Sequence, residues 1–226
     1  MANTIRVLSS LGTREVVEAI APDFERARAC AVARVYDSSI GLLKRVADGE
    51  TADVAVFTAA ALDGIVAQGK VVSRIDVSRS FVGMAVRKGA PRPDIGTPDK
   101  LKQALLAAKS LAHSKTGASG IYFASLIDRL GLRDALKAKT IVRDGIVANI
   151  AASGEAELAV QQISELMQSA GIDIVGPLPD ELQQVTIFSA GVFTGSAQIG
   201  LAEAFVASLA SPANAALIRA KGMEPA

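Results

Sequence analysis

Small hydroxyl residues lie where the chain turns from a predicted strand into a helix. Ser9-Ser10 follows the strand predicted at residues 5–8, Ser38-Ser39 follows the one at 32–36, and the segment from Thr116 to Ser119 precedes a later helix. Helix N-termini present unpaired backbone N–H groups and a partial positive charge. Because the crevice of an open α/β sheet lies beyond the C-terminal ends of its strands, several such turns could bind one anion there without lysine or arginine.

The same serines and threonines have a plainer interpretation, in which each caps its own helix. An N-cap hydroxyl contributes about 1 kcal/mol, and any α/β protein needs such caps. We expect Thr13 or Ser10 to cap the first helix, and Thr97 to cap a helix whose first residue is Pro98. For three turns together, two of them with serine pairs, the anion site and the capping interpretation both stay open.

Composition narrows the range of partners. The 226 residues carry 24 basic and 23 acidic side chains without long runs of either sign, so nucleic acid and acidic membrane surfaces are not expected as partners. Tryptophan is absent and aromatic residues make up 4%, which favours a small polar ligand. With one histidine and one cysteine, Cys30, we expect no disulfide, no metal and no cofactor. No apolar run approaches the roughly 20 residues of a membrane span, so no membrane insertion is expected.

The N-terminal residues 1–20 run directly into a predicted strand and an acidic helix start. A basic segment followed by an apolar stretch and a cleavage site is not seen there, so the chain as written predicts no secretion signal. We expect a periplasmic protein if a signal peptide has been removed, and a cytoplasmic one if the chain is native as written.

Short β-rich runs alternate with helical stretches of about a dozen residues, the pattern of a mostly parallel sheet with helices on both faces. The predicted fold class is therefore α/β. Beyond the strands at 5–8 and 32–36, further strands are expected at 53–57, 81–87, 111–113, 140–142, 158–161, 172–175 and 185–193. Gly49 and Gly69 are expected to end two of the helices.

Three segments resemble the molybdate-binding family of periplasmic solute-binding proteins: Ser9-Ser10, Asp37 to Val54, and Gly117 to Tyr122. The most specific part is Ser38 to Val54, in which a serine pair, a helix, a glycine and an Ala-Asp strand keep the family's spacing. The resemblance extends over nearly the whole chain. It implies two Rossmann-like lobes with a hinge and a central cleft, the type II periplasmic-binding fold.

For such a fold we expect lobe 1 to comprise residues 1–79 and 194–226, and lobe 2 to comprise residues 80–193. Two strands, near 81–86 and 185–192, are expected to cross between the lobes. A ligand in the cleft would be buried when the hinge closes.

The resemblance also implies ligand-binding positions. The family's second-turn serine falls on Ser38 or Ser39, its helix start that binds through backbone N–H falls on residues 118–120, and its first-turn serine falls on Gly12. A further backbone N–H is expected near residues 145–147. Together with neighbouring hydroxyl residues and two glutamines, the expected ligand-binding set is Ser9, Ser10, Ser38, Ser39, Thr116, Ser119, Gly120, Gln161 and Gln162.

The glutamines mark a departure from the family. Molybdate binders usually have a tyrosine where this sequence has Gln161-Gln162. Side-chain amides offer donors and acceptors, which suits a carboxylate with a neighbouring hydroxyl or protonated oxygen better than a tetrahedral metal oxyanion. We therefore rank a small organic acid above molybdate as the ligand.

The stretch from Gln161 to Leu166, together with residues 175–183, is similar to a divergent branch that includes bacterial aconitate isomerase. This resemblance implies an enzymatic alternative, in which a proton next to a carboxylate is removed and returned one position away. The candidate catalytic residues are His113 and Tyr122, and for both we favour a packing role.

Four charged residues near these segments could assist. Glu165 and Asp144 could act as bases but would be weak ones, and both are expected to be solvated. Arg143 and Lys115 could pair with a substrate carboxylate or lie on the rim of the site.

The sequence thus predicts a monomeric solute-binding protein for a small anion, a di- or tricarboxylate or a molybdate-like oxyanion, that delivers its ligand to an ABC permease. The alternative is an isomerase of a small polycarboxylate, cis/trans or double-bond, that uses the same cleft. An intracellular anion sensor ranks third. A nucleophile elbow, a dinucleotide fingerprint and a Walker loop are not found.

Overall fold

The computed structural model describes residues 3–226 and divides the chain into two compact units. Unit 1 comprises the residues up to Ser80 together with Thr186–Ala226, and unit 2 is Phe81–Val185. From the sequence we expect the second lobe boundary between residues 193 and 194. In the structure, unit 2 ends at Val185 and unit 1 resumes at Thr186. The difference arises because the strand Val185–Val192 pairs with Val54–Thr58 of unit 1.

Unit 1 is built on a sheet with the strand order β2-β1-β3-β9. The bounds of these strands are β1 Asn3–Ser10, β2 Cys30–Asp37, β3 Val54–Thr58 and β9 Val185–Val192. β1 is parallel to β2 and β3, and β9 is antiparallel to β3. Unit 1 also contains the first part of β4 (Ile75–Arg87), which pairs with β10 (Glu224–Pro225).

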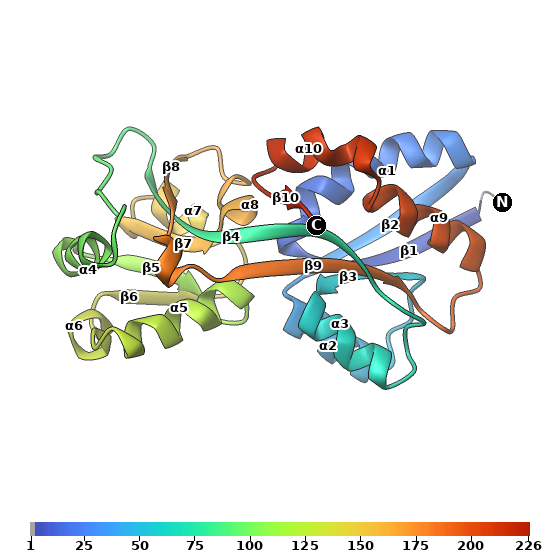
Figure 1. The fold of residues 1–226 in the computed structure, drawn as a ribbon, viewed down its shortest axis with the longest axis horizontal. Coiled ribbons are helices and arrows are strands. Elements are labelled where there is room, and N and C mark those ends of the chain that lie inside the picture. Colours follow the sequence, from blue (N-terminus) through green and yellow to red (C-terminus); the bar gives the residue numbers. More distant parts are fainter. Residues whose placement is uncertain (1–2) are drawn as a thin grey trace. The chain divides into compact units, whose positions relative to one another are not determined.

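Helices cover both faces of the unit 1 sheet (Figure 1). Their bounds are η1 Leu11–Thr13, α1 Arg14–Arg28, α2 Ser39–Ala47, α3 Ala59–Ala67, α9 Ile199–Leu209, η3 Pro212–Asn214 and α10 Ala215–Ala220. Val7 of β1 packs in a core with α1 and α9, whereas the next residue, Leu8, packs in a second core with α2 and α3. Successive side chains of a strand point to opposite faces, so a sheet covered on both sides needs strands that are apolar throughout.

Unit 2 has the strand order β4-β7-β5-β6, with β8 also paired to β4. The bounds are β5 Leu111–Ser114, β6 Thr140–Arg143, β7 Leu158–Gln162 and β8 Ile172–Pro177. β5 is parallel to β6 and β7, whereas β7 and β8 are antiparallel to β4. The C-terminal ends of β5, β6 and β7 therefore lie at the same edge.

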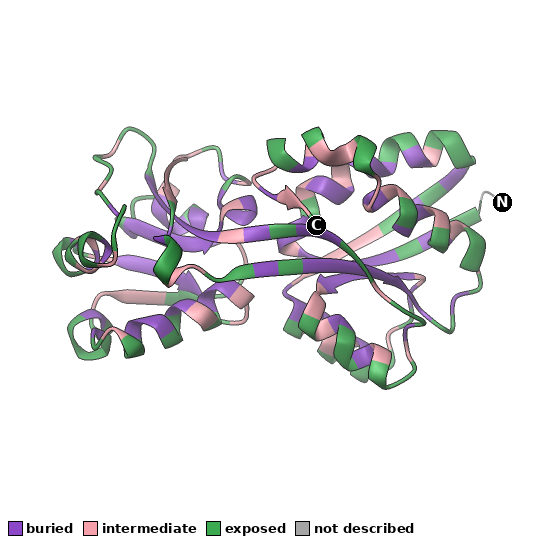
Figure 2. Ribbon diagram, viewed as in Figure 1, coloured by how far each residue is buried: buried purple, intermediate pink, exposed green. Residues whose placement is uncertain are grey.

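The helices of unit 2 also cover both faces of its sheet. Their bounds are α4 Pro98–Ala107, α5 Ala118–Arg129, α6 Arg133–Lys137, α7 Ala148–Ala152, α8 Ile163–Leu166 and η2 Asp180–Leu182. Leu111 and Leu158 pack against α4, α5 and α6, whereas Ala112 and Ala159 face α7 and α8. In Figure 2 buried residues fill β5 and β7, whereas β6 and β8 are intermediate to exposed.

These features confirm the predicted α/β class and several of its turns. Gly49 and Gly69 follow α2 and α3 with φ values of 94° and 69°, which favour glycine. Thr97 caps α4, because its hydroxyl accepts a hydrogen bond from the N–H of Lys100 at 3.3 Å. Thr13 is the N-cap residue of α1 and Ser10 is that of η1, so the predicted positions are confirmed, but neither residue makes a side-chain cap bond.

Within residues 3–226, no single helix is long and apolar enough to cross a bilayer; Ile199–Leu209 and Pro212–Ala220 meet the length and composition criteria only as a pair bent by 46°.

Candidate functional site

The predicted serines of unit 1 lie together at the C-terminal edge of its parallel strands. Ser10 ends β1 and is paired in register with Asp37, which ends β2, and β3 ends nearby at Thr58. Ser9, Ser10, Ser38 and Ser39 are all buried. The four serines therefore form one buried group at this edge of the sheet.

Ser38 and Ser39 both accept hydrogen bonds from backbone N–H groups. The Ser38 hydroxyl accepts one from Gly41 at 3.1 Å, which makes it the N-cap of α2. The Ser39 hydroxyl accepts one from the N–H of Thr58 at 3.0 Å and thereby joins the start of α2 to the end of β3. Each hydroxyl keeps its own hydrogen as a donor, so capping and ligand binding are compatible in these two residues.

A carboxylate of the chain itself lies at the start of α2, a feature that the sequence analysis missed. The Oδ1 atom of Asp37 accepts a hydrogen bond from the N–H of Ser38 at 2.7 Å. A Cβ atom on Gly41 would lie 2.5 Å from Asp37 Oδ2, so only glycine leaves room for this carboxylate. Asp37 therefore already supplies negative charge at this amide-bearing turn, which disfavours a second concentrated negative charge beside it.

The first turn, after β1, is organised by hydroxyl contacts. Ser9 Oγ lies 2.9 Å from Thr13 Oγ1, and the Thr13 hydroxyl donates to the carbonyl oxygen of Ser10 at 3.0 Å. A Cβ atom on Gly12, the position of the family's first-turn serine, would lie 2.5 Å from the ring of Phe188. A serine at position 12 would require the Phe188 ring to move, so the hydroxyls of this turn come from Ser9, Ser10 and Thr13 instead.

In unit 2, Gln161 is buried and its amide is bonded to a neighbouring loop. Its Oε1 atom accepts a hydrogen bond from the N–H of Val147 at 2.9 Å, and its Nε2 atom donates to the carbonyl oxygen of Gly145 at 2.9 Å. The loop that was expected to offer a backbone N–H to the ligand is thus attached to the end of β7. Gln162 is buried as well, with 1% of its surface exposed.

Glu165 is buried next to these glutamines, contrary to the expectation that it is solvated. Burial raises the pKa of its carboxyl group to about 7, an effect partly offset by hydrogen bonds from the Gln161 side chain and the Gln162 backbone. Its Oε2 atom has no hydrogen-bond partner within residues 3–226. A side chain that is half protonated near pH 7 can both take up and release a proton.

The start of α5 brings Ser119 and Gly120 to the same edge of unit 2 as Gln161. Both are buried, and so is Ser114 at the end of β5, a residue absent from the expected site. The pairing of β5 with β7 runs to His113 and Val160, so the next residues on the two strands are Ser114 and Gln161. Ser114, Ser119 and Gln161 therefore lie at the same edge of the unit 2 sheet.

Thr116 and the charged residues around it are attached to the loop after β6. The Thr116 hydroxyl donates to Asp144 Oδ1 at 2.7 Å, and Asp144 is exposed, as expected. Arg143 is also exposed and forms an ion pair with Glu155 at 2.5 Å. Lys115 is exposed as well. Arg143 and Lys115 therefore both lie on the surface, which is one of the two positions expected for them from the sequence.

His113 and Tyr122 make contacts of the packing kind. The His113 ring packs edge-on against Phe123 with centroids 5.7 Å apart, its Nδ1 lies 3.0 Å from the Ser114 carbonyl oxygen, and burial lowers its pKa. The Tyr122 hydroxyl donates to the carbonyl oxygen of Leu182 at 2.7 Å. Packing is the role that the sequence analysis favoured for both residues, and catalysis stays the less favoured hypothesis.

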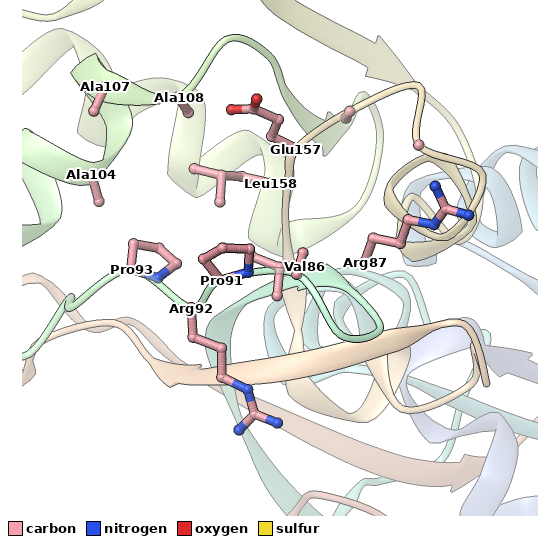
Figure 3. Close-up of a pocket in the computed structure, with 13 residues that line it drawn as sticks. Val86, Arg87, Pro91, Arg92, Pro93, Ala104, Ala107, Ala108, Glu157 and Leu158 are labelled. Carbon is pink, nitrogen blue, oxygen red and sulfur yellow. The ribbon is translucent and has the colours of Figure 1, made fainter.

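A cavity of about 510 Å³ lies elsewhere in unit 2 (Figure 3). It is lined by Leu158, the first residue of β7, and by Val86 near the end of antiparallel β4, so it lies at the edge opposite to Gln161. In Figure 3 the guanidinium groups of Arg87 and Arg92 point in different directions, and Arg92 forms an ion pair with Asp173 at 3.5 Å. None of the expected site residues lines this cavity.

The fold, with polar residues at the ends of its parallel strands, is that of a solute-binding protein. The chain belongs to the bacterial extracellular solute-binding protein family, whose sequence profile matches residues 5–224. This membership and the fold comparisons confirm the type II solute-binding fold and the resemblance to molybdate binders.

Among characterised relatives, aconitate isomerase from a Pseudomonas species is 38% identical over 231 residues, which cover 98% of this chain and 88% of that protein. Among solved structures, the periplasmic molybdate-binding protein of Azotobacter vinelandii superposes with a TM-score of 0.81 at 19% identity, covering 97% of this chain and 98% of that one. The sulfate-binding protein of Mycobacterium tuberculosis has a TM-score of 0.76 at 19% identity, covering 99% and 87%. At such identities the solved structures support the fold alone.

Proposed function

We propose that this protein binds a small organic acid with two or three carboxylate groups. The observation that carries the proposal is the buried carboxyl group of Glu165 beside Gln161, in a buried polar set without lysine or arginine among residues 3–226. Neutral hydroxyl, amide and backbone N–H donors can bind a carboxylate. The Glu165 carboxyl would repel a compact dianion, but it can share a proton with a carboxyl or hydroxyl group of an organic acid.

A transport role agrees with family membership. We infer that the protein works in the periplasm as a monomer and delivers its ligand to an ABC permease. A thermal-shift screen over molybdate, tungstate, sulfate, phosphate, succinate, citrate and cis- and trans-aconitate tests the ligand class, since a ligand that binds only the folded state raises the melting temperature. Stabilisation by the carboxylates is the expected result, and stabilisation by the tetrahedral oxyanions alone would contradict it.

The sequence further predicts that serines of both units contribute to binding the same ligand. Ser39→Ala in unit 1 and Ser119→Ala in unit 2 test this prediction by isothermal titration calorimetry with trans-aconitate. Each variant is expected to bind about tenfold more weakly or worse, because a hydrogen bond to a charged group is lost. Unchanged affinity in either variant would remove that unit from the binding site.

Isomerisation of the bound acid is a second candidate, favoured by Glu165 and by the 38% identity to aconitate isomerase. The Glu165 carboxylate would take a proton from the methylene carbon of an aconitate. The electron pair left behind would shift the double bond by one position, and the same proton would return from Glu165 to the carbon at the far end of the allyl unit. Atoms and charge balance without an oxidant or a further reactant.

Proton NMR of the purified protein with cis-aconitate tests this candidate. Turnover is expected to fall by about 10²-fold or more in Glu165→Gln, the usual range for loss of a general acid–base group. Glu181→Gln makes the same chemical change at an exposed position of unit 2 and should leave turnover within about twofold. Tight binding without interconversion would exclude the isomerase, whereas turnover would exclude a role in binding alone.

A further inference from the structure

Two hydroxyl groups at the start of α5 are buried without a hydrogen-bond partner. Ser114 and Ser119 are 2% and 1% exposed, and neither Oγ atom has a partner within residues 3–226. Buried hydroxyls in folded proteins are nearly always bonded, and leaving one without a partner is destabilising. Two such hydroxyls at one turn point to a partner outside the described residues.

Both hydroxyls lie at the same turn. A Cβ atom on Gly117 would lie 2.4 Å from Ser114 Oγ and 4.0 Å from Ser119 Oγ. A Cβ atom on Gly120 would also lie 2.4 Å from Ser114 Oγ, and 1.9 Å from the Ser114 carbonyl oxygen. The two glycines therefore allow Ser114 to lie directly against the first turn of α5, and any side chain there would displace it.

Helix capping does not account for these hydroxyls. Gly117 is the N-cap of α5, so the cap position has no side chain. Ser38 and Thr97, which do cap helices, accept hydrogen bonds from the N–H groups of Gly41 and Lys100. Ser114 and Ser119 make no such bond within residues 3–226.

Backbone donors are also available at this turn. The N–H groups of Gly120 and Ile121 donate to the carbonyl oxygen of Gly117. The N–H groups of Ala118 and Ser119 come earlier in the helix, where no intrahelical acceptor exists. The turn therefore combines two O–H donors with two N–H donors at the positive end of a helix of 12 residues.

We propose that Ser114 and Ser119 form a carboxylate subsite with the first N–H groups of α5. A carboxylate has about four lone-pair positions, which matches the four donors of this turn. The inference rests on the proposed binding of an organic acid and adds Ser114, which is not among the ligand-binding residues expected from the sequence or the family pattern. Ser114 binds the ligand through its hydroxyl group, and Gly117 and Gly120 leave room for that hydroxyl against the first turn of α5.

The first test needs no ligand. Because Ser114 Oγ has no partner in the folded chain, Ser114→Ala should keep the melting temperature of the wild type or raise it. Thr97→Ala removes a hydroxyl that is bonded and should lower the melting temperature by about 2–4 °C. A drop in Ser114→Ala as large as that in Thr97→Ala would show a partner within the fold and overturn the subsite, whatever the protein binds.

The second test measures affinity for trans-aconitate by calorimetry. Ser114→Ala and Ser119→Ala should each bind about tenfold more weakly or worse. Ser153→Ala is the matched control in unit 2, because the Ser153 hydroxyl donates to the Ile150 carbonyl oxygen at 3.0 Å and should not affect binding. Wild-type affinity in both Ser114→Ala and Ser119→Ala would overturn the subsite and leave the proposed function intact. A wild-type protein that binds no carboxylate would overturn the proposed function and the subsite with it.

Discussion

The side-chain amide of Gln161 donates a hydrogen bond to the carboxyl group of Glu165 and also holds the backbone of Gly145 and Val147. One amide thus connects a titratable group to the loop that follows β6. Ionised Glu165 accepts this bond, whereas protonated Glu165 accepts it more weakly. The protonation state of Glu165 is therefore coupled to the loop through Gln161.

The stability of the protein should depend on pH through Glu165. Below pH 4.5, its ordinary pKa, the carboxyl group is protonated in the folded and unfolded states alike. Between pH 4.5 and about 7 the unfolded state ionises first, so the folded state loses stability as the pH rises, by about 3 kcal/mol in total. Above about pH 7 both states are ionised and the loss is complete.

Urea unfolding of the wild type and of Glu165→Gln at pH 5, 6, 7 and 8 measures this effect. Glutamine does not titrate, and all other groups cancel in the difference between the two proteins. The free energy of unfolding of Glu165→Gln should therefore increase relative to that of the wild type as the pH rises. A difference that stays constant from pH 5 to pH 8 would show that Glu165 titrates normally.

Much of the fold could be predicted because it follows from local patterns. Val7 and Leu8 are both apolar because the sheet is covered on both faces, and a continuous apolar run indicates such a strand. The start of β4 at Ile75, before the predicted residue 81, was missed. Ser78 and Ser80 interrupt the apolar pattern there, yet both are buried, because burial depends on neighbours far away in the chain.

The site was less predictable, since its properties come from contacts between distant segments. Glu165 lies in a helix of four residues, too short for a periodicity that would mark its buried side. The partners of Gln161 are backbone groups of a different loop, which no motif indicates. The spacing of Gly117, the N-cap of α5, and Gly120, three residues later, is the one signal that could have pointed to Ser114.

Ser38 is expected to serve α2 and the ligand together. Ser38→Ala should lower the free energy of unfolding by about 1 kcal/mol, because the cap bond to Gly41 is lost. It should also weaken binding of trans-aconitate in calorimetry. Thr97→Ala removes an equivalent cap from α4 and should lower stability by a similar amount without changing affinity. Equal affinities in the two variants would mean that Ser38 acts only as a cap.

Position 12 should not tolerate a side chain while Phe188 is present. Gly12→Ala is expected to cost about 1–3 kcal/mol, because its Cβ atom would lie 2.5 Å from the Phe188 ring. Phe188→Leu should relieve this collision, so the double variant should be more stable than the sum of the single effects predicts. Additive losses in urea unfolding would show that the ring and Gly12 do not constrain each other.

Tyr122 provides a test of packing against catalysis. Tyr122→Phe keeps the ring in the unit 2 core and removes the hydrogen bond from its hydroxyl to the Leu182 carbonyl oxygen, which should cost about 1 kcal/mol of stability. Since this hydroxyl already donates to Leu182, we expect binding of trans-aconitate, and any interconversion of aconitates, to stay within about twofold of the wild type. Urea unfolding and proton NMR on the same preparation separate the two roles. Unchanged stability together with lost interconversion would assign the Tyr122 hydroxyl to proton transfer rather than to packing, and would mean that its contact with Leu182 is replaced when a substrate binds.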